Sequence, residues 1–86
     1  MSTDPNINIM LGAKLKKIRN EQKITREALS EMIDISSRFM ADVESGKVGV
    51  SLATLKKICK VLGVSSDHLL GITDEEYSEG YEREIN

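Results

Sequence analysis

Side chains that could carry out chemistry are few in this chain and lie far apart. It contains one histidine, His68, and one cysteine, Cys59. A lone histidine lacks the further ligands that a metal site needs, and a lone cysteine can form neither an internal disulfide nor a thiolate zinc site. The carboxylates do not follow the spacing of a known hydrolase, and no glycine-rich phosphate loop is present. The sequence therefore favours a protein that is not an enzyme and needs no metal or cofactor.

The most informative polar pattern lies in residues 25–47, TREALSEMIDISSRFMADVESGK. The stretch is typical of two short helices joined by a tight turn. The second of these, expected over residues 36–45, carries a mixed polar face that core packing does not require. We interpret this face as one that enters the major groove of DNA, with the rest of the chain holding the helix pair rigid.

The charge distribution is compatible with such a partner. The whole chain has a net charge of −2, but residues 1–73 hold eleven basic and eight acidic residues, whereas residues 74–86 hold one and six. A mildly basic body followed by an acidic tail permits DNA binding without demanding it. No apolar run approaches ~20 residues, the first ten residues do not resemble a secretory signal, and the single cysteine fits a reducing cytosol, so a cytoplasmic location is expected.

The polar face must be positioned by an all-α fold with one aliphatic core, because the length allows one domain and aromatic residues are scarce. The first helix is expected to begin at Pro5, or one turn later with Asn8 as its cap, and to end near Gln22. Leu11, Leu15 and Ile18 form its apolar stripe.

Three further helices follow at clear boundary signals. Thr25 is the expected cap of a helix that ends near Ile33, with an apolar face of Ala28, Leu29, Met32 and Ile33. Asp34 is the turn residue, since aspartate tolerates the left-handed conformation. Ser36 caps the third helix, which Gly46 ends, and Ser51 caps the fourth, which Gly63 ends.

A short fifth helix over residues 67–70 is expected to be capped by Ser65 or Ser66 and closed by Gly71. We expect the domain to span residues 1–72 and the acidic tail to span residues 73–86. The tail has a capping-box sequence at residues 73–76, and Tyr77, Tyr81 and Ile85 recur at i, i+4 and i+8. It is therefore a candidate for an extra helix, although an acidic tail can also dock on a basic patch or remain disordered.

The chain resembles the helix-turn-helix family of Cro and phage-repressor type, also called lambda-repressor-like. The matching segments are LGAKLKKIR at 11–19, the helix start at Thr25, DISSRFMADVESGK at 34–47 and SLATLKKICKVLGVSSDHLLG at 51–71. The resemblance implies a compact five-helix domain whose third helix is the recognition helix. It also implies binding to a pseudo-palindromic site as a homodimer, with half-sites roughly 34 Å apart.

The resemblance assigns base reading to Ser37, Arg38 and Asp42, beside Phe39 and Ala41. The Arg38 guanidinium can contact guanine O6 and N7, and Phe39 can meet a thymine methyl group, a sugar or the protein core. Asp42 can accept a hydrogen bond from cytosine N4 or pair with Arg38 four residues earlier. Arg26 can reach a phosphate or a guanine. The implied DNA-contacting set is Thr25, Arg26, Ser36, Ser37, Arg38, Phe39, Ala41, Asp42, Lys47 and Gly49.

The resemblance also implies an ion pair between Arg19 and Glu44 that ties the first helix to the third. We expect a dimer interface on the fifth helix and the tail, made by Leu69, Leu70, Ile72, Tyr77, Tyr81 and Ile85. Cys59 is expected to pack in the core and His68 to be exposed. The favoured function is that of a transcriptional regulator, and specifically a repressor. The alternative is a protein-interaction module, such as an antitoxin or an anti-repressor partner.

Overall fold

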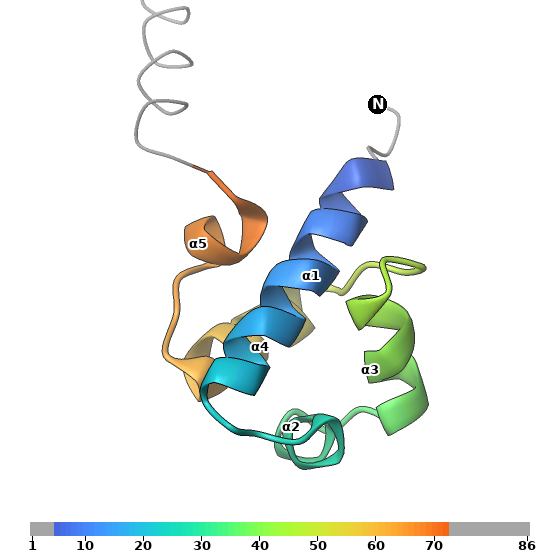
Figure 1. Ribbon diagram of the computed structural model, residues 1–86, viewed down its shortest axis with the longest axis vertical. Coiled ribbons are helices and arrows are strands. Elements are labelled where there is room, and N and C mark those ends of the chain that lie inside the picture. Colours follow the sequence, from blue (N-terminus) through green and yellow to red (C-terminus); the bar gives the residue numbers. More distant parts are fainter. Residues whose placement is uncertain (1–4, 73–86) are drawn as a thin grey trace, which may run out of the picture.

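The computed structural model describes residues 5–72, which form five α-helices (Figure 1). Their bounds are Pro5–Glu21 (α1), Arg26–Met32 (α2), Ser37–Glu44 (α3), Leu52–Leu62 (α4) and Ser66–Leu70 (α5). The five-helix, all-α fold predicted from the sequence is confirmed over this range. The chain is already helical at Pro5, the first described residue, so the alternative start with Asn8 as the cap is wrong. The extra helix expected in the tail lies outside the described residues.

Side-chain caps set where the four later helices begin. The hydroxyls of Thr25, Ser36, Ser51 and Ser65 each accept a hydrogen bond from the backbone N–H three residues ahead, at 3.0–3.1 Å. Each cap satisfies a donor that the helix itself leaves unpaired. The structure also decides between the two predicted caps of α5, because Ser65 is the cap and Ser66 is the first helical residue.

The helix ends share one closing hydrogen bond. After every helix a backbone N–H bonds to the carbonyl five residues earlier, at 2.9–3.1 Å, which is the outer bond of a Schellman motif. Glycine takes the left-handed position after α3, α4 and α5, as predicted. Non-glycine residues take it elsewhere: Asp34 has φ 61°, as expected of the turn between α2 and α3, and Lys23 has φ 60°, which the sequence did not reveal.

The core is aliphatic and centres on α1. Leu11, Leu15 and Ile18 are buried there, as their spacing predicted. α1 packs against α3 on one side and α5 on the other, α2 packs against α3, and α4 packs against α5 (Figure 1). The remaining buried apolar residues are Leu29, Ile33, Met40, Val43, Ile58, Leu62 and Leu69.

One expected core residue is exposed. Met32 was predicted on the apolar face of α2, but it is 56% exposed, whereas Leu29 and Ile33 are buried. At 100° per residue, Leu29, Ile33 and the buried Ser30 occupy one narrow arc of this short helix, and Met32 lies outside it. None of the helices in residues 5–72 is long and apolar enough to cross a membrane.

Candidate nucleic-acid interface

The third helix divides into a buried face and an open face. Met40, Val43 and Glu44 are buried against the rest of the domain. Facing outward are Ser37 and Arg38, which are exposed, and Ala41 and Asp42, which are half-buried. At 100° per residue these four lie within one continuous arc, so the structure brings the predicted base-reading positions together on a single face.

Phe39 borders this open face, and Ser45 belongs to it. Phe39 is 36% exposed and lies between the outward arc and the buried Val43, so it packs partly on the domain and partly faces outward. Ser45 lies within the outward arc and is exposed, and its hydroxyl donates to the backbone carbonyl of Asp42 at 3.0 Å. Ser45 was not among the predicted contact residues, although its spacing of four from Ala41 could have indicated it.

The expected pairing between Arg38 and Asp42 is absent. Neither Arg38 nor Asp42 takes part in the two ion pairs of the described residues that involve Glu44, which join it to Arg19 and Arg26. An arginine placed four residues before an acid is the less favourable order of such a pair on a helix. Arg38 and Asp42 are thus two separate polar groups on the open face.

A buried carboxylate on the opposite side fixes how α3 sits. Arg19 Nε donates to Glu44 Oε2 at 2.6 Å, and Arg19 Nη2 donates to Glu44 Oε1 at 3.2 Å. The third donor, Arg19 Nη1, bonds the carbonyl of Ile24 at 2.8 Å. The Arg19–Glu44 pair implied by the family resemblance is therefore present, as a two-bond fork between side chains that are 8% and 2% exposed.

Arg26 joins the same carboxylate from α2. Its Nε donates to Glu44 Oε1 at 3.2 Å, and its side chain is 38% exposed. We expected Arg26 to reach DNA. In the structure one of its nitrogens also links the start of α2 to α3 through Glu44. Glu44 thus accepts hydrogen bonds from two helices, and no buried side-chain polar atom in residues 5–72 lacks a partner.

Gly12, which was not among the predicted functional residues, lets α1 approach α3 closely. A Cβ added to Gly12 would lie 2.2 Å from the carbonyl oxygen of Val43 and 2.7 Å from that of Glu44. Only a residue without a side chain fits there. The place of Gly12 next to Leu11, on the buried side of the first helix, was the available signal.

The other residues of the expected DNA-contacting set surround α3. Thr25, Ser36 and Lys47 are exposed, and the first two use their hydroxyls as helix caps. Gly49 is half-buried, and a Cβ placed on it would lie 2.7 Å from Oδ1 of Asn8. Asn8 of α1 therefore closely approaches the backbone of Gly49 on that side.

The predicted dimer interface needs one correction. Leu69 is fully buried in the core of its own chain, so its side chain has no surface to offer a second copy. It lies on the inward side of a five-residue helix that packs against α1 and α4. Leu70 and Ile72 are half-buried, and Tyr77, Tyr81 and Ile85 lie outside the described residues.

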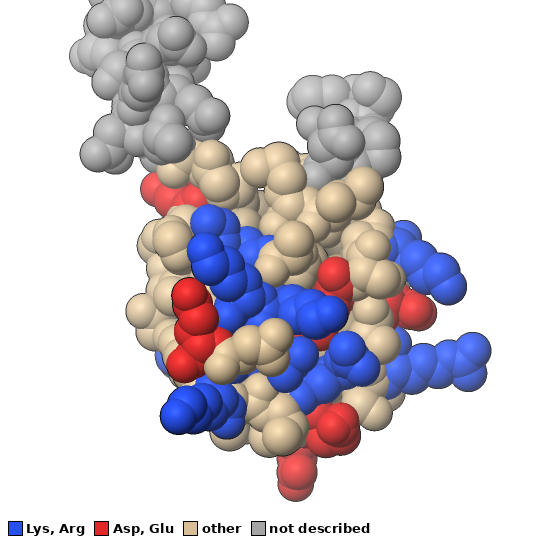
Figure 2. Space-filling view, viewed as in Figure 1, with Lys and Arg blue, Asp and Glu red and all other residues tan. Residues whose placement is uncertain are grey.

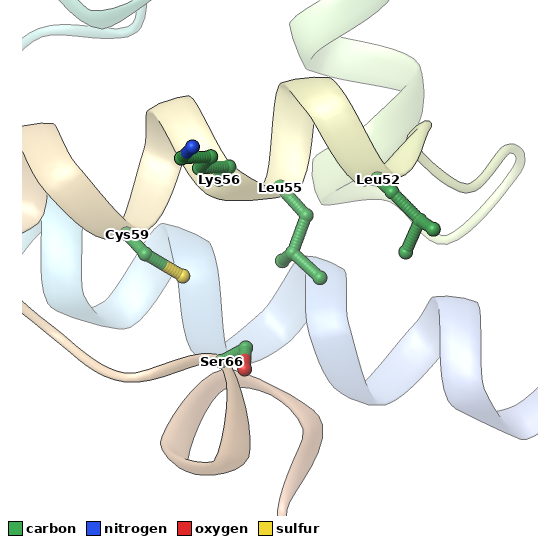
Figure 3. A pocket seen from close by; sticks show the side chains of 5 residues that line it. All are labelled: Leu52, Leu55, Lys56, Cys59 and Ser66. Atoms are coloured by element: carbon green, nitrogen blue, oxygen red, sulfur yellow. The ribbon is translucent and has the colours of Figure 1, made fainter.

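A groove of about 280 Å³ between α4 and α5 is lined by Leu52, Leu55, Lys56, Cys59 and Ser66 (Figure 3). Cys59 packs against the core, as predicted, and burial raises the pKa of its thiol. His68 is exposed, as predicted, and is not among the lining residues. A raised pKa keeps the Cys59 thiol protonated, and no acid or histidine lines the groove beside it. The groove therefore contains no pair of a nucleophile and a base.

Basic side chains gather on the face of the molecule on which α1 lies in front, with most of the acidic surface toward the edges of this face (Figure 2). α1 itself carries exposed Lys16 and Lys17 and half-buried Lys14. The described part of the chain therefore presents basic surface outside the recognition helix.

Comparison with known proteins gives the same architecture. The family model HTH_3, helix-turn-helix, matches residues 15–69. The immunity repressor protein of Bacillus phage phi105 is 32% identical over 81 residues, or 87% of this chain, and the chain covers only 56% of that protein's length. Control protein C.BamHI of Bacillus amyloliquefaciens is 35% identical over 69 residues, which are 79% of this chain and 85% of that protein.

Two solved structures share the fold. The clp gene regulator ClgR from C. glutamicum superposes with a TM-score of 0.72 at 29% identity, covering 80% of this chain and 90% of that one. The restriction-modification controller protein C.AhdI from Aeromonas hydrophila gives a TM-score of 0.68 at 22% identity, covering 72% and 94%. At that identity the second likeness supports the arrangement of the helices and nothing finer.

Proposed function

The chain belongs to the HTH_3 helix-turn-helix family, whose members are DNA-binding transcriptional regulators, and we propose that it is a repressor that binds a pseudo-palindromic operator as a homodimer. The observation that supports this most directly is the two-sided build of α3. Its inner face is clamped through Glu44 to α1 and α2, while its outer face presents Arg38, Asp42, Ser37 and Ala41 to the surroundings.

On the outer face, Arg38 reads guanine through a pair of hydrogen bonds to O6 and N7. Asp42 accepts a hydrogen bond from cytosine N4, a role open to it because it does not pair with Arg38. Ser37 contacts a base edge, Ala41 permits close approach, and Phe39 meets a thymine methyl group at the border of the face.

The surrounding residues contact the DNA backbone and set the orientation of the domain rather than its sequence preference. This set comprises Thr25, Ser36, Lys47 and the Gly49 backbone, together with Arg26. Nε of Arg26 bonds Glu44, and the terminal nitrogens Nη1 and Nη2 have no partner within residues 5–72. We assign these two nitrogens to a phosphate.

In this proposal repression follows from occupying the operator and excluding polymerase, and two copies meet through the end of α5 and the tail. The surface there consists of Leu70 and Ile72, followed in the sequence by Tyr77, Tyr81 and Ile85. Removing residues 73–86 should turn the dimer into a monomer in sedimentation analysis. A dimer of unchanged stability would exclude the tail from the interface.

The decisive test is selection of bound duplexes from a random pool, run with the natural chain and with Arg38→Ala. A two-fold symmetric consensus from the natural chain, with the preference for one guanine lost in the variant, is the expected result. The matched control is Lys56→Ala, an exposed residue on α4, which should return the natural consensus. No enriched sequence at low salt would refute operator binding.

The acidic tail, with a net charge of −5 over residues 74–86, supports the alternative of a protein-interaction module such as an antitoxin or an anti-repressor partner. Salt dependence separates the two functions. Affinity for DNA should fall steeply as salt rises, in proportion to the phosphates contacted, if DNA is the specific partner.

A further inference from the structure

We propose that the first residues of the acidic tail, Asp74–Tyr77, dock on an exposed stripe of α1 in the same chain. This stripe, called here the α1 stripe, consists of Ile7, Met10, Ala13, Lys14 and Lys17. The tail would thereby be anchored along α1 from the point at which it leaves α5.

The α1 stripe is an apolar and basic surface that residues 5–72 leave partly exposed, with Gly71 at the end of α5 lying against Met10. Ile7 is 42% exposed and Met10 49%, and the two lie one helical turn apart. A shallow groove of about 300 Å³ is lined by Met10, Ala13, Lys14 and Lys17. Met10, Ala13, Lys14 and Lys17 recur at i, i+3, i+4 and i+7 and so form one stripe along α1. At 100° per residue, Ile7 and Lys14 place this stripe directly beside the buried face of Leu11 and Ile18.

The chain passes this stripe as it leaves the described domain. A Cβ added to Gly71 would lie 2.8 Å from Cε of Met10, which places the end of α5 against the upper part of the stripe. Lys17 is seven residues from Met10 along α1, roughly 10 Å at the rise of an α-helix. The four residues 73–76 can span about 13 Å when extended, so the acids of the tail reach both lysines.

The chemistry of the tail complements the stripe. Three consecutive acids, Asp74, Glu75 and Glu76, follow directly after Thr73 and can pair with Lys14 and Lys17. Tyr77 comes next and supplies an apolar ring with a polar tip, which suits a surface formed by Met10, Ala13 and lysine stems. One short segment thus supplies both acids for the two lysines and an aromatic ring for the apolar surface.

Docking in the same chain is favoured because the segment starts at the edge of its site, which gives it a high effective concentration there. Docking would take Tyr77 out of the proposed dimer interface. Tyr81 and Ile85, four and eight residues beyond it, would remain available to a second copy. This last consequence rests on the proposed dimer, whereas the docking itself does not require DNA or a dimer.

The chain offers a direct probe of this contact, because both of its tyrosines lie in the tail and it has no tryptophan. In a Tyr81→Phe background all tyrosine fluorescence comes from Tyr77, and acrylamide quenching measures how accessible that ring is. The test variant is Lys14→Glu/Lys17→Glu. The matched control is Lys56→Glu/Lys57→Glu, which makes the same change of charge at exposed positions of α4.

Losing two exposed ion pairs should lower the docking equilibrium constant by about two- to thirtyfold, so quenching of Tyr77 should rise in the test variant and not in the control. Adding Asp74→Lys/Glu76→Lys to the test variant should restore protection.

Equal quenching in all variants would overturn the proposal. Protection that grows with protein concentration would also overturn it, because the tail would then dock on another copy. The operator selection described above is unaffected by either result, so failure of this proposal can be told from failure of the proposed function.

Discussion

The substitution Glu44→Gln tests most directly how the ion pairs of Glu44 hold the recognition helix α3 in place. The substitution keeps the size of the side chain but removes the one negative charge that Arg19 and Arg26 share. Arg19 is affected most, because its side chain is only 8% exposed and its one other hydrogen-bond acceptor is the carbonyl of Ile24. The guanidinium would stay buried with its charge uncompensated.

Breaking a buried pair by removing one partner costs about 3–5 kcal/mol. A chain of 86 residues has a total free energy of unfolding of roughly 4–13 kcal/mol. Glu44→Gln should therefore remove a large fraction of the stability. At about 4–8 °C per kcal/mol for a domain of this size, the midpoint of thermal unfolding should fall by more than about 12 °C.

The assay is urea unfolding followed by circular dichroism, and the control is Arg26→Gln. Arg26 is 38% exposed, so water can solvate what that change leaves behind, and the loss should be about 1 kcal/mol or less. Replacing both buried partners, as Arg19→Met/Glu44→Leu, should recover most of the stability, because no unpaired charge remains. A loss below about 1 kcal/mol for Glu44→Gln would refute the reasoning.

Two further predictions concern local backbone and thiol chemistry. Asp34→Gly should raise the free energy of unfolding by about 0.5–1 kcal/mol in urea titrations. The left-handed conformation at φ 61° costs about 1–2 kcal/mol, and the conformational entropy of glycine in the unfolded chain offsets part of the gain. Glu31→Gly within α2 should instead lower the free energy of unfolding by about 1 kcal/mol, and a decrease at both sites would contradict the argument. Iodoacetamide should alkylate Cys59 in the folded chain with a pH midpoint above the roughly 8.5 of a free thiol, because burial raises the pKa of this thiol. The same measurement in urea should return the ordinary midpoint, and a folded midpoint at or below it would contradict the cause given.

Local signals in the sequence were enough to place the helices, because the groups that start and stop a helix act within a few residues. Thr25, Ser36 and Ser51 were identified as caps from residue type and position alone, and each hydroxyl accepts the expected N–H. The left-handed Asp34 was found for the same reason. Lys23 also adopts the left-handed conformation, but lysine has no preference for it, so the residue type could not have predicted it.

Long-range packing was less accessible. Leu69 and Met32 are both apolar residues near the end of a short helix, yet one is fully buried and the other is 56% exposed. Periodicity over five or seven residues cannot say which arc a neighbouring helix will cover. The bond from Arg26 to Glu44 joins residues 18 positions apart and depends on how α2 and α3 cross. Neither family resemblance nor spacing pointed to it.

That unforeseen bond changes how the open face of α3 is to be understood. Glu44 lies on the inner side of the helix whose outer side carries Arg38 and Asp42, so its ion pairs to α1 and α2 fix how the open face is presented. Arg26 reaches from the domain surface to that carboxylate with one nitrogen, and in the proposed complex its terminal nitrogens hold a phosphate. One guanidinium would then join the DNA backbone to the helix that reads the bases. A lysine has a single nitrogen and could not make both contacts in that geometry.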